Sequence, residues 1–264
     1  MEYWLQRQLR SQEILTNKKI SEVEKQIKKY YESTLKSVIR DFESTYDKVL
    51  LSIEEGREPT PADLYKLDKY WQMQAQTAAR LEQLGNKEIK LLSKKFVEEF
   101  NEIYEGIALK TDLYFGRIDE ALVKEMIERV WCADGISWSK RIWKNIEQLK
   151  LTLDEGLIEC LVTGKKTTQL KQTLMQRFDV SYSRAKTLVQ TEMAHIQTTA
   201  AAKRYQDYGI EQYEILGREE DECGAKVECH KMHGKKFFYS EMKVGTNAPP
   251  FHPNCRCAIA PVIE

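Results

Sequence analysis

The sequence predicts an α+β protein, in which a long N-terminal α-helical arm is followed by a compact helical C-terminal domain with a small antiparallel β-sheet. Two observations predict this class. Apolar residues recur at the three-and-four spacing of one helical face along most of the chain up to Gly209. Beyond Gly209 this periodicity stops, and short runs of β-branched and aromatic residues alternate with polar, glycine-containing loops.

The arm is predicted to contain four helices. Gly56 and Pro59 end the first one, and Thr60 followed by Pro61 starts the second, because a threonine cap with proline at the first helical position favours a helix start. Gly85 is expected to interrupt the chain again, since glycine lowers helix propensity. The expected helices cover residues 18–55, 61–84, 87–110 and 118–130.

The C-terminal domain is predicted to begin with shorter helices. The string 152–155 resembles a capping box, and Gly164 is placed to end the helix that it opens. Another helix is expected around Leu170, and a longer one runs from about Ser181 and ends before Gly209. Short strands are expected over residues 212–216, 236–239 and 258–263.

The boundary between arm and domain is placed near three tryptophans, Trp131, Trp138 and Trp143. Large aromatic residues concentrated there are expected to pack the arm against the C-terminal domain rather than to line a ligand pocket. We therefore predict a helical arm over residues 1–135 and a second domain over residues 136–264.

Composition limits the partners. The chain has 41 basic and 41 acidic residues, so no overall field draws it to nucleic acid or to an anionic membrane. Its longest apolar runs are interrupted well short of the roughly 20 residues that span a bilayer, and the N-terminus lacks a signal-peptide core. We expect synthesis in the cytoplasm and no membrane contact.

Positive charge is concentrated in the middle of the chain, where residues 140–204 hold 12 basic against 6 acidic residues, a local net charge of +6. Such a stretch predicts binding to phosphates without base readout, and a solvated helix surface is the alternative. The candidate DNA-binding residues are Lys165, Lys166, Lys171, Arg177, Arg184, Lys186, Lys203 and Arg204.

Cysteine and histidine side chains gather near the C-terminus. The candidate metal ligands are Cys223, Cys229, His252, Cys255 and Cys257. Two ligands from one loop and two from a later one suit a tetrahedral zinc that staples a small sheet, and four protein ligands favour a closed structural site over a catalytic one. A disulfide between Cys229 and either Cys255 or Cys257 is the alternative, and simple burial of the cysteines is another.

No catalytic group is assigned. His230 and His233 lie beside Cys229 and either extend the metal site or stay solvated. Glu192 and His195 share a helical face, but no nucleophile is placed beside them, so a structural role is favoured for Thr191 and Glu192. No glycine-rich phosphate loop is present. The sequence therefore predicts a protein that is not an enzyme.

The order of these features resembles a known family. The turn at Gly164, the string QTEMA at 190–194, Tyr208–Gly209, the cysteine pair before Gly234 and the terminal HPNCRC at 252–257 are similar to the Mu F-type head morphogenesis domain of tailed bacteriophages. The resemblance covers about residues 140–264.

The resemblance implies a minor capsid protein of the virion, attached near the portal inside the head and acting in head assembly, DNA packaging or DNA delivery. It implies contacts with the portal protein and with viral DNA, and contacts with major capsid or scaffolding protein are compatible with it. The amphipathic arm suits docking on the portal or self-association. Two rivals come from other classes: a zinc-dependent, nuclease-like enzyme and a cellular DNA-binding protein.

Overall fold

The computed structural model describes residues 2–50, 60–65, 67–107, 118–217 and 229–263. It confirms the α+β class, because helices dominate and a small antiparallel sheet lies near the C-terminus. The helices are α1 Glu2–Leu50, α2 Pro61–Leu64, α3 Asp68–Gly106, α4 Glu120–Glu128, α5 Trp138–Val162 and α6 Thr167–Asp207. The strands are β1 Gln212–Leu216, β2 Lys236–Phe238 and β3 Ala258–Pro261, and two 3₁₀ turns are η1 Cys229–Met232 and η2 Tyr239–Glu241.

The chain divides into two compact units that do not follow its order. The sheet unit combines residues 1–23, 91–140 and 186–264, and the helical unit combines residues 24–90 and 141–185. Helices α1, α3, α5 and α6 therefore contribute to both units. The division into an arm over residues 1–135 and a domain over residues 136–264 stays a prediction about which part folds independently.

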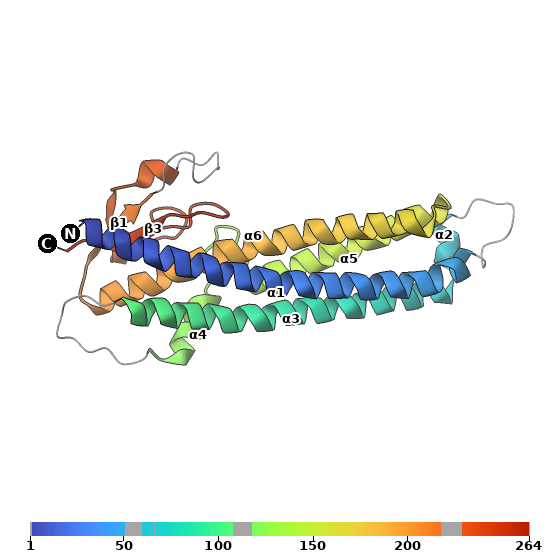
Figure 1. The fold of residues 1–264 in the computed structure, drawn as a ribbon, viewed down its shortest axis with the longest axis horizontal. Coiled ribbons are helices and arrows are strands. Elements are labelled where there is room, and N and C mark those ends of the chain that lie inside the picture. The colour runs from blue at the N-terminus through green and yellow to red at the C-terminus, as the bar shows by residue number, and fades with distance from the viewer. Residues whose placement is uncertain (1, 51–59, 66, 108–117, 218–228, 264) are drawn as a thin grey trace. The chain divides into compact units, whose positions relative to one another are not determined.

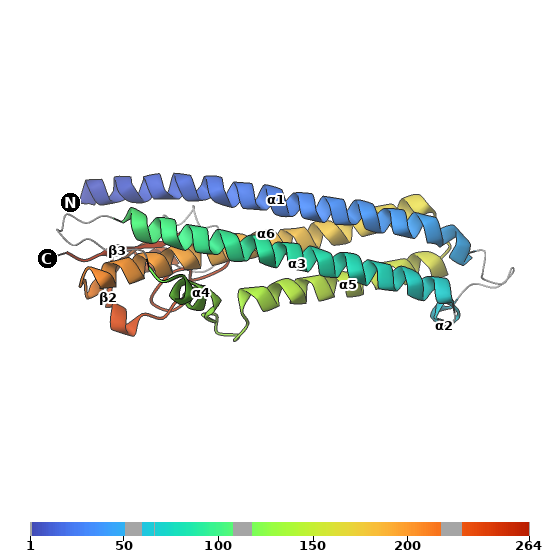
Figure 2. The same cartoon turned by 90° about the horizontal axis from the view of Figure 1, so that it is seen from below.

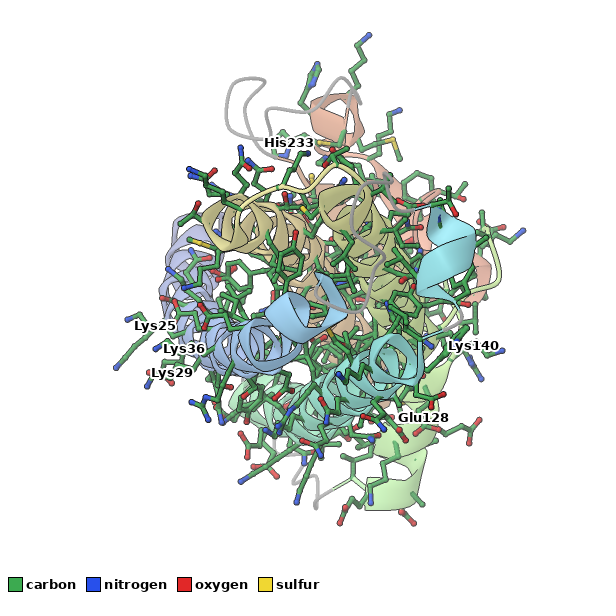
Figure 3. All side chains as sticks on the ribbon, turned by 90° about the vertical axis from the view of Figure 1, so that its right-hand side faces the viewer. Lys25, Lys29, Lys36, Glu128, Lys140 and His233 are labelled. Carbon is green, nitrogen blue, oxygen red and sulfur yellow. The ribbon has the colours of Figure 1, made fainter. Side chains whose placement is uncertain are left out.

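In the helical unit, α1, α3, α5 and α6 run side by side (Figures 1 and 2). Their inward faces supply a continuous apolar core, whose fully buried members include Ile27, Phe42, Met73, Leu81, Leu84, Leu157 and Phe178. On the other side of α1, the lysines Lys25, Lys29 and Lys36 are exposed and project outward (Figure 3). The three-and-four apolar pattern of the sequence is thus the buried stripe of a helix bundle.

One predicted break is absent at Gly85, where α3 continues without interruption. A Cβ atom at Gly85 would lie 2.8 Å from Cζ3 of the Trp143 ring. The glycine therefore provides room for an indole ring to approach the helix backbone, and the prediction of two separate helices here was wrong. Packing against a neighbouring helix has outweighed the low helix propensity of one residue.

Two further boundaries were also wrong. Thr152 lies inside α5, and its Oγ1 donates to the carbonyls of Gln148 and Leu149, 3.0 Å away in each case, instead of capping a new helix. Ser181 lies inside a single helix α6, where its carbonyl accepts a hydrogen bond from Nδ2 of Asn145 at 2.9 Å.

Gly164 and Gly209 did mark the ends of the helices that they were expected to end, whereas Gly56 and Pro59 lie outside the described residues. Gly164 follows α5 with φ of +61°, and Gly209 follows α6 with φ of +77°. In this left-handed region a residue without Cβ is favoured. After Gly164 the amide of Lys165 donates to the carbonyl of Cys160 at 2.9 Å, which closes the last turn of α5.

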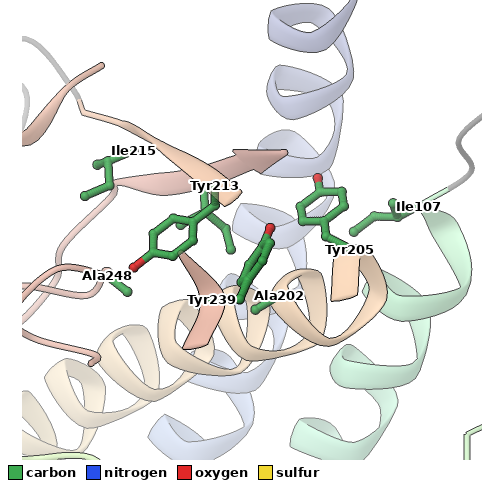
Figure 4. Packing of buried hydrophobic residues seen from close by; sticks show 8 residues of the cluster. Ile107, Ala202, Tyr205, Tyr213, Ile215, Tyr239 and Ala248 are labelled. Atoms are coloured by element: carbon green, nitrogen blue, oxygen red, sulfur yellow. The ribbon is translucent and has the colours of Figure 1, made fainter. Parts of the chain in front are cut away.

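The sheet of the sheet unit has the strand order β2-β1-β3, and both pairs are antiparallel. Its apolar side packs on the end of α6, where Tyr213 and Tyr239 meet Ala202 and Tyr205 (Figure 4). Tyr213 also donates a hydrogen bond from its hydroxyl to the carbonyl of Asn247 at 3.1 Å. Large aromatic side chains thus anchor the three-stranded sheet to the end of α6.

The tryptophans behave largely as expected. Trp138 is buried and meets the ring of Phe96 edge-on with centroids 5.2 Å apart, which joins the start of α5 to α3 within the sheet unit. Trp143 covers Gly85 in the helical unit and stays 38% exposed. Among the described helices, none has a stretch long and apolar enough to cross a membrane.

Candidate metal centre

The candidate centre lies in the sheet unit, between η1 and the loop that precedes β3. Cys229 opens η1, and His252 and Cys255 belong to the loop. All three are buried, with exposed fractions of 2%, 8% and 4% in that order. Their ligand atoms all lie within 4.8 Å of one another, and Nε2 of His252 is 3.3 Å from Sγ of Cys229.

The loop fixes the tautomer of His252. Its Nδ1 lies 2.8 Å from the carbonyl oxygen of Pro253, and a carbonyl can only accept, so Nδ1 carries the proton. The lone pair of Nε2 is then free to face the sulfur of Cys229. A ring nitrogen held in this way by a backbone carbonyl is the usual arrangement of a metal-binding histidine.

The loop is also held against α6. Asn254 adopts φ of +59°, and its amide donates to Oγ1 of Thr191 at 3.1 Å. The same hydroxyl donates to the carbonyl of Thr187 at 2.7 Å, so its direction is set by the helix. Within the loop, the amide of Cys255 donates to the carbonyl of His252 at 3.1 Å. The string at 190–194, which contains Thr191, and the string at 252–257, which contains Asn254, were both recognised in the sequence, but their contact was not predicted.

The chemistry of the cluster fits a zinc ion. Tetrahedral ligands at about 2.0–2.3 Å from zinc lie about 3.3–3.8 Å from one another, so the observed group would need only a small contraction. A hydrogen bond from Cys257 lowers the pKa of the Cys255 thiol, which favours the thiolate, the form that binds a metal. The residues present therefore form a preorganised set of one nitrogen and two sulfur ligands.

Of the five predicted ligands, the structure brings three together. Cys257 is buried and packs in the same cluster with Cys229 and Cys255, but it is not one of the three mutually close ligands. Cys223 lies outside the described residues. No disulfide joins the described cysteines.

The neighbouring histidines are not part of this group. His233 is exposed, and its Nδ1 accepts a hydrogen bond from the amide of Gly217 at 3.2 Å. His230 is partly exposed in η1. This arrangement agrees with the interpretation of both as loop residues rather than ligands.

Glu192 and His195 serve packing. Nε1 of Trp131 donates to the buried carboxylate of Glu192 at 2.9 Å, and the Trp131 ring stacks on His195 with centroids 4.8 Å apart. Burial lowers the pKa of His195 to about 3, so its ring is neutral at physiological pH. These contacts agree with the structural role predicted for Thr191 and Glu192.

The predicted DNA-binding residues fall into three groups. Lys165, Lys171 and Lys203 form ion pairs with Glu159, Glu43 and Asp207. Lys166, Arg177, Arg184 and Lys186 are exposed. Arg204 differs from all of them because it is only 7% exposed.

Arg204 is engaged inside the sheet unit. Its Nε donates to the carbonyl of Ile107 at 3.1 Å, and its guanidinium lies 4.9 Å from the ring centre of Tyr104 and 4.7 Å from that of Tyr208. A guanidinium held between two aromatic rings and a carbonyl stabilises the fold. It is not part of a surface that a phosphate could reach.

These observations define a class of protein that is rich in helix and has a small C-terminal sheet, with a buried cysteine/histidine cluster between η1 and the loop before β3. Residues 152–260 match the model of the family described as Phage Mu protein F like protein. The resemblance found in the sequence is therefore confirmed, for a segment that contains both the cluster and the Thr191 contact. No curated protein and no solved structure matches the chain. The family is one of bacteriophage head morphogenesis.

Proposed function

We propose that the chain is a minor capsid protein of a tailed bacteriophage, bound near the portal inside the head and acting in head assembly, DNA packaging or DNA delivery without catalysing a reaction. The observation that carries this proposal is the family match over residues 152–260. Its partners would be the portal protein and viral DNA, with major capsid or scaffolding protein and a second copy of the chain as further candidates.

The cluster would hold zinc in a structural role. Cys229, His252 and Cys255 would supply three ligands, and Cys257 or Cys223 the fourth. The bound ion would join η1 to the loop before β3. Such a link suits this sheet, because three strands of three to five residues bury too little apolar surface to be stable alone.

DNA contact would be local and independent of sequence. The supporting residues in the helical unit are Lys166, Arg177 and Arg184, which are exposed on and just before α6. Three phosphate contacts give a slope of about −3 in log affinity against log salt concentration. Replacing all three with glutamine should remove that slope, whereas Lys203→Gln should change it little because Lys203 already pairs with Asp207.

Particles of the phage or prophage that encodes the chain provide the direct test. The chain should be found by mass spectrometry in purified particles, and the isolated portal protein should retain it on a column. A deletion of its gene should lower the yield of DNA-filled or infectious particles. Absence from purified particles together with an unaffected yield would remove the proposal.

The zinc-dependent nuclease is the competing function, because the three close ligands match the number that a catalytic zinc uses. It predicts metal-dependent cleavage of plasmid DNA by the purified chain. It also predicts that neither Cys223→Ser nor Cys257→Ser lowers the zinc content. A structural site predicts no cleavage, and loss of zinc in one of these two variants.

A further inference from the structure

A layer of polar side chains crosses the apolar core of the helical unit. Each of its four long helices contributes one residue, Tyr31 from α1, Glu88 from α3, Asn145 from α5 and Ser181 from α6. On α3, Glu88 follows Leu81 and Leu84 in the apolar stripe, at a position where the helical spacing calls for an apolar residue. Its exposed fraction is 1%.

The hydroxyl of Tyr31 is the centre of this layer. Nδ2 of Asn145 donates to it at 3.1 Å, and the hydroxyl of Ser181 lies 3.4 Å away. Tyr31 is also hydrogen bonded to the carboxyl of Glu88. With Asn145 and Ser181 as donors, the one proton of the Tyr31 hydroxyl is available for Glu88.

Two buried acceptors of the layer remain without a donor among the described residues, Oε1 of Glu88 and Oδ1 of Asn145. Only burial and the hydrogen bond from Tyr31 act on the ionisation of the Glu88 carboxyl, and Asn145 and Ser181 are uncharged. Within the described part of the chain, no cation therefore compensates a negative charge on this carboxyl. A buried carboxylate without a cation is costly.

The sheet unit shows the contrast. One of its buried glutamates, Glu99, accepts hydrogen bonds from Nζ of Lys19 at 3.0 Å and from Nε2 of Gln197 at 2.9 Å. Both carboxylates are buried on the same helix, but of the two only Glu99 has an ammonium group beside it in the described structure. Glu88 therefore needs another way to remove its charge.

We propose that Glu88 binds a proton in the folded helical unit, and that this proton couples the stability of the unit to pH. Oε1 of Glu88 is an acceptor without a partner among the described residues, and a proton on it makes it a donor. Oδ1 of Asn145, in the same layer, is an acceptor that lacks a donor among those residues. The layer is then neutral. This inference does not depend on the proposed function.

The direction of the pH dependence follows from the two states. Burial raises the pKa of Glu88 from 4.5, its value in an unfolded chain, to about 7. The unit is therefore most stable below pH 4.5 as far as this group is concerned, and it loses that stability as pH rises through 7. The folding equilibrium constant should fall roughly 70-fold between about pH 5 and pH 8.

Hydrogen exchange of the full chain tests this locally. After correction for intrinsic exchange rates, protection of α3 amides around residue 88 should fall by that factor over the same pH range. Glu88→Gln should remove the dependence, because the amide is neutral at all pH values. Glu82→Gln is the matched control, since Glu82 is exposed on the same helix and should leave the dependence unchanged.

A second measurement does not rely on a variant that folds. Infrared spectra of the unmodified chain should show a protonated carboxylic acid band that disappears as pH passes through about 7. A band that titrates near pH 4.5, or α3 protection that is equally pH-dependent in Glu88→Gln, would overturn the proposal.

Discussion

The two units of this protein are stabilised in different ways. The helical unit buries large apolar side chains from four long helices, and its polar layer is a small interruption of that core. The sheet unit has three short strands, a group of buried tyrosines and a cysteine/histidine cluster. Apolar burial stabilises the first, whereas we propose that the small sheet of the second also relies on specific polar contacts and on a metal bound by its cluster. Changes to metal, apolar volume or single polar groups should therefore affect the two units differently.

The largest difference should appear on removal of metal. We expect near one zinc per chain and protection of the cluster thiols from alkylation until a strong chelator is added. Because structural zinc contributes on the order of 10 kcal/mol to small domains, stripping it should expose the amides of β1 and β3 to hydrogen exchange and leave the centre of the helical unit protected. Cys255→Ser should have the same effect.

Cys132→Ser is the matched control, since Cys132 lies in the sheet unit outside the cluster. A chain without metal, whose cysteines resist alkylation until a reductant is added, would show that a disulfide joins the sheet instead.

The converse prediction concerns the apolar core. Phe42→Ala removes a ring that is 1% exposed in the helical unit, and such truncations cost about 3–5 kcal/mol. Urea denaturation should show the loss, and the zinc content should not change. A simultaneous loss of zinc would mean that the two units are not stabilised separately.

The sequence predicted the parts of this comparison that depend on local patterns. The apolar stripes, the glycines after α5 and α6, the three strands and the cysteine-rich loop could all be recognised. What it did not show depends on residues far away in the chain. Gly85 stays helical because Trp143 packs on it, and Ser181 stays helical beside Asn145.

The candidate site shows the same limit. The motif at 252–257 predicted the ligand types, but it did not predict which cysteines would be closest to His252. Arg204 was predicted to be a surface cation on the basis of its charge. The groups that contact it could not be predicted locally, since the carbonyl of Ile107 and the ring of Tyr104 come from another part of the chain and Tyr208 from the next helical turn. A count of charges along the sequence does not show that Arg204 is buried.

Arg204 gives a prediction of intermediate size. Arg204→Met keeps much of the side-chain volume but removes the bond to Ile107 and the contacts with the rings of Tyr104 and Tyr208. We expect a loss of about 2–3 kcal/mol in the stability of the sheet unit. The salt dependence of DNA binding should not change, because the guanidinium is not exposed. A reduced salt slope with unchanged stability would contradict the buried position.

The smallest effect should come from the contact between α6 and the cluster loop. Thr191→Val keeps the shape of the side chain but removes the hydroxyl that accepts from the amide of Asn254. The loss should be about 1–2 kcal/mol, and zinc should be released at a lower chelator concentration because the loop that carries His252 and Cys255 is less well held. Thr199→Val is the matched control, since the hydroxyl of Thr199 donates to the carbonyl of His195 within the same helix. If both variants release zinc like the unmodified chain, the cluster holds its loop without help from the Thr191 hydroxyl of α6.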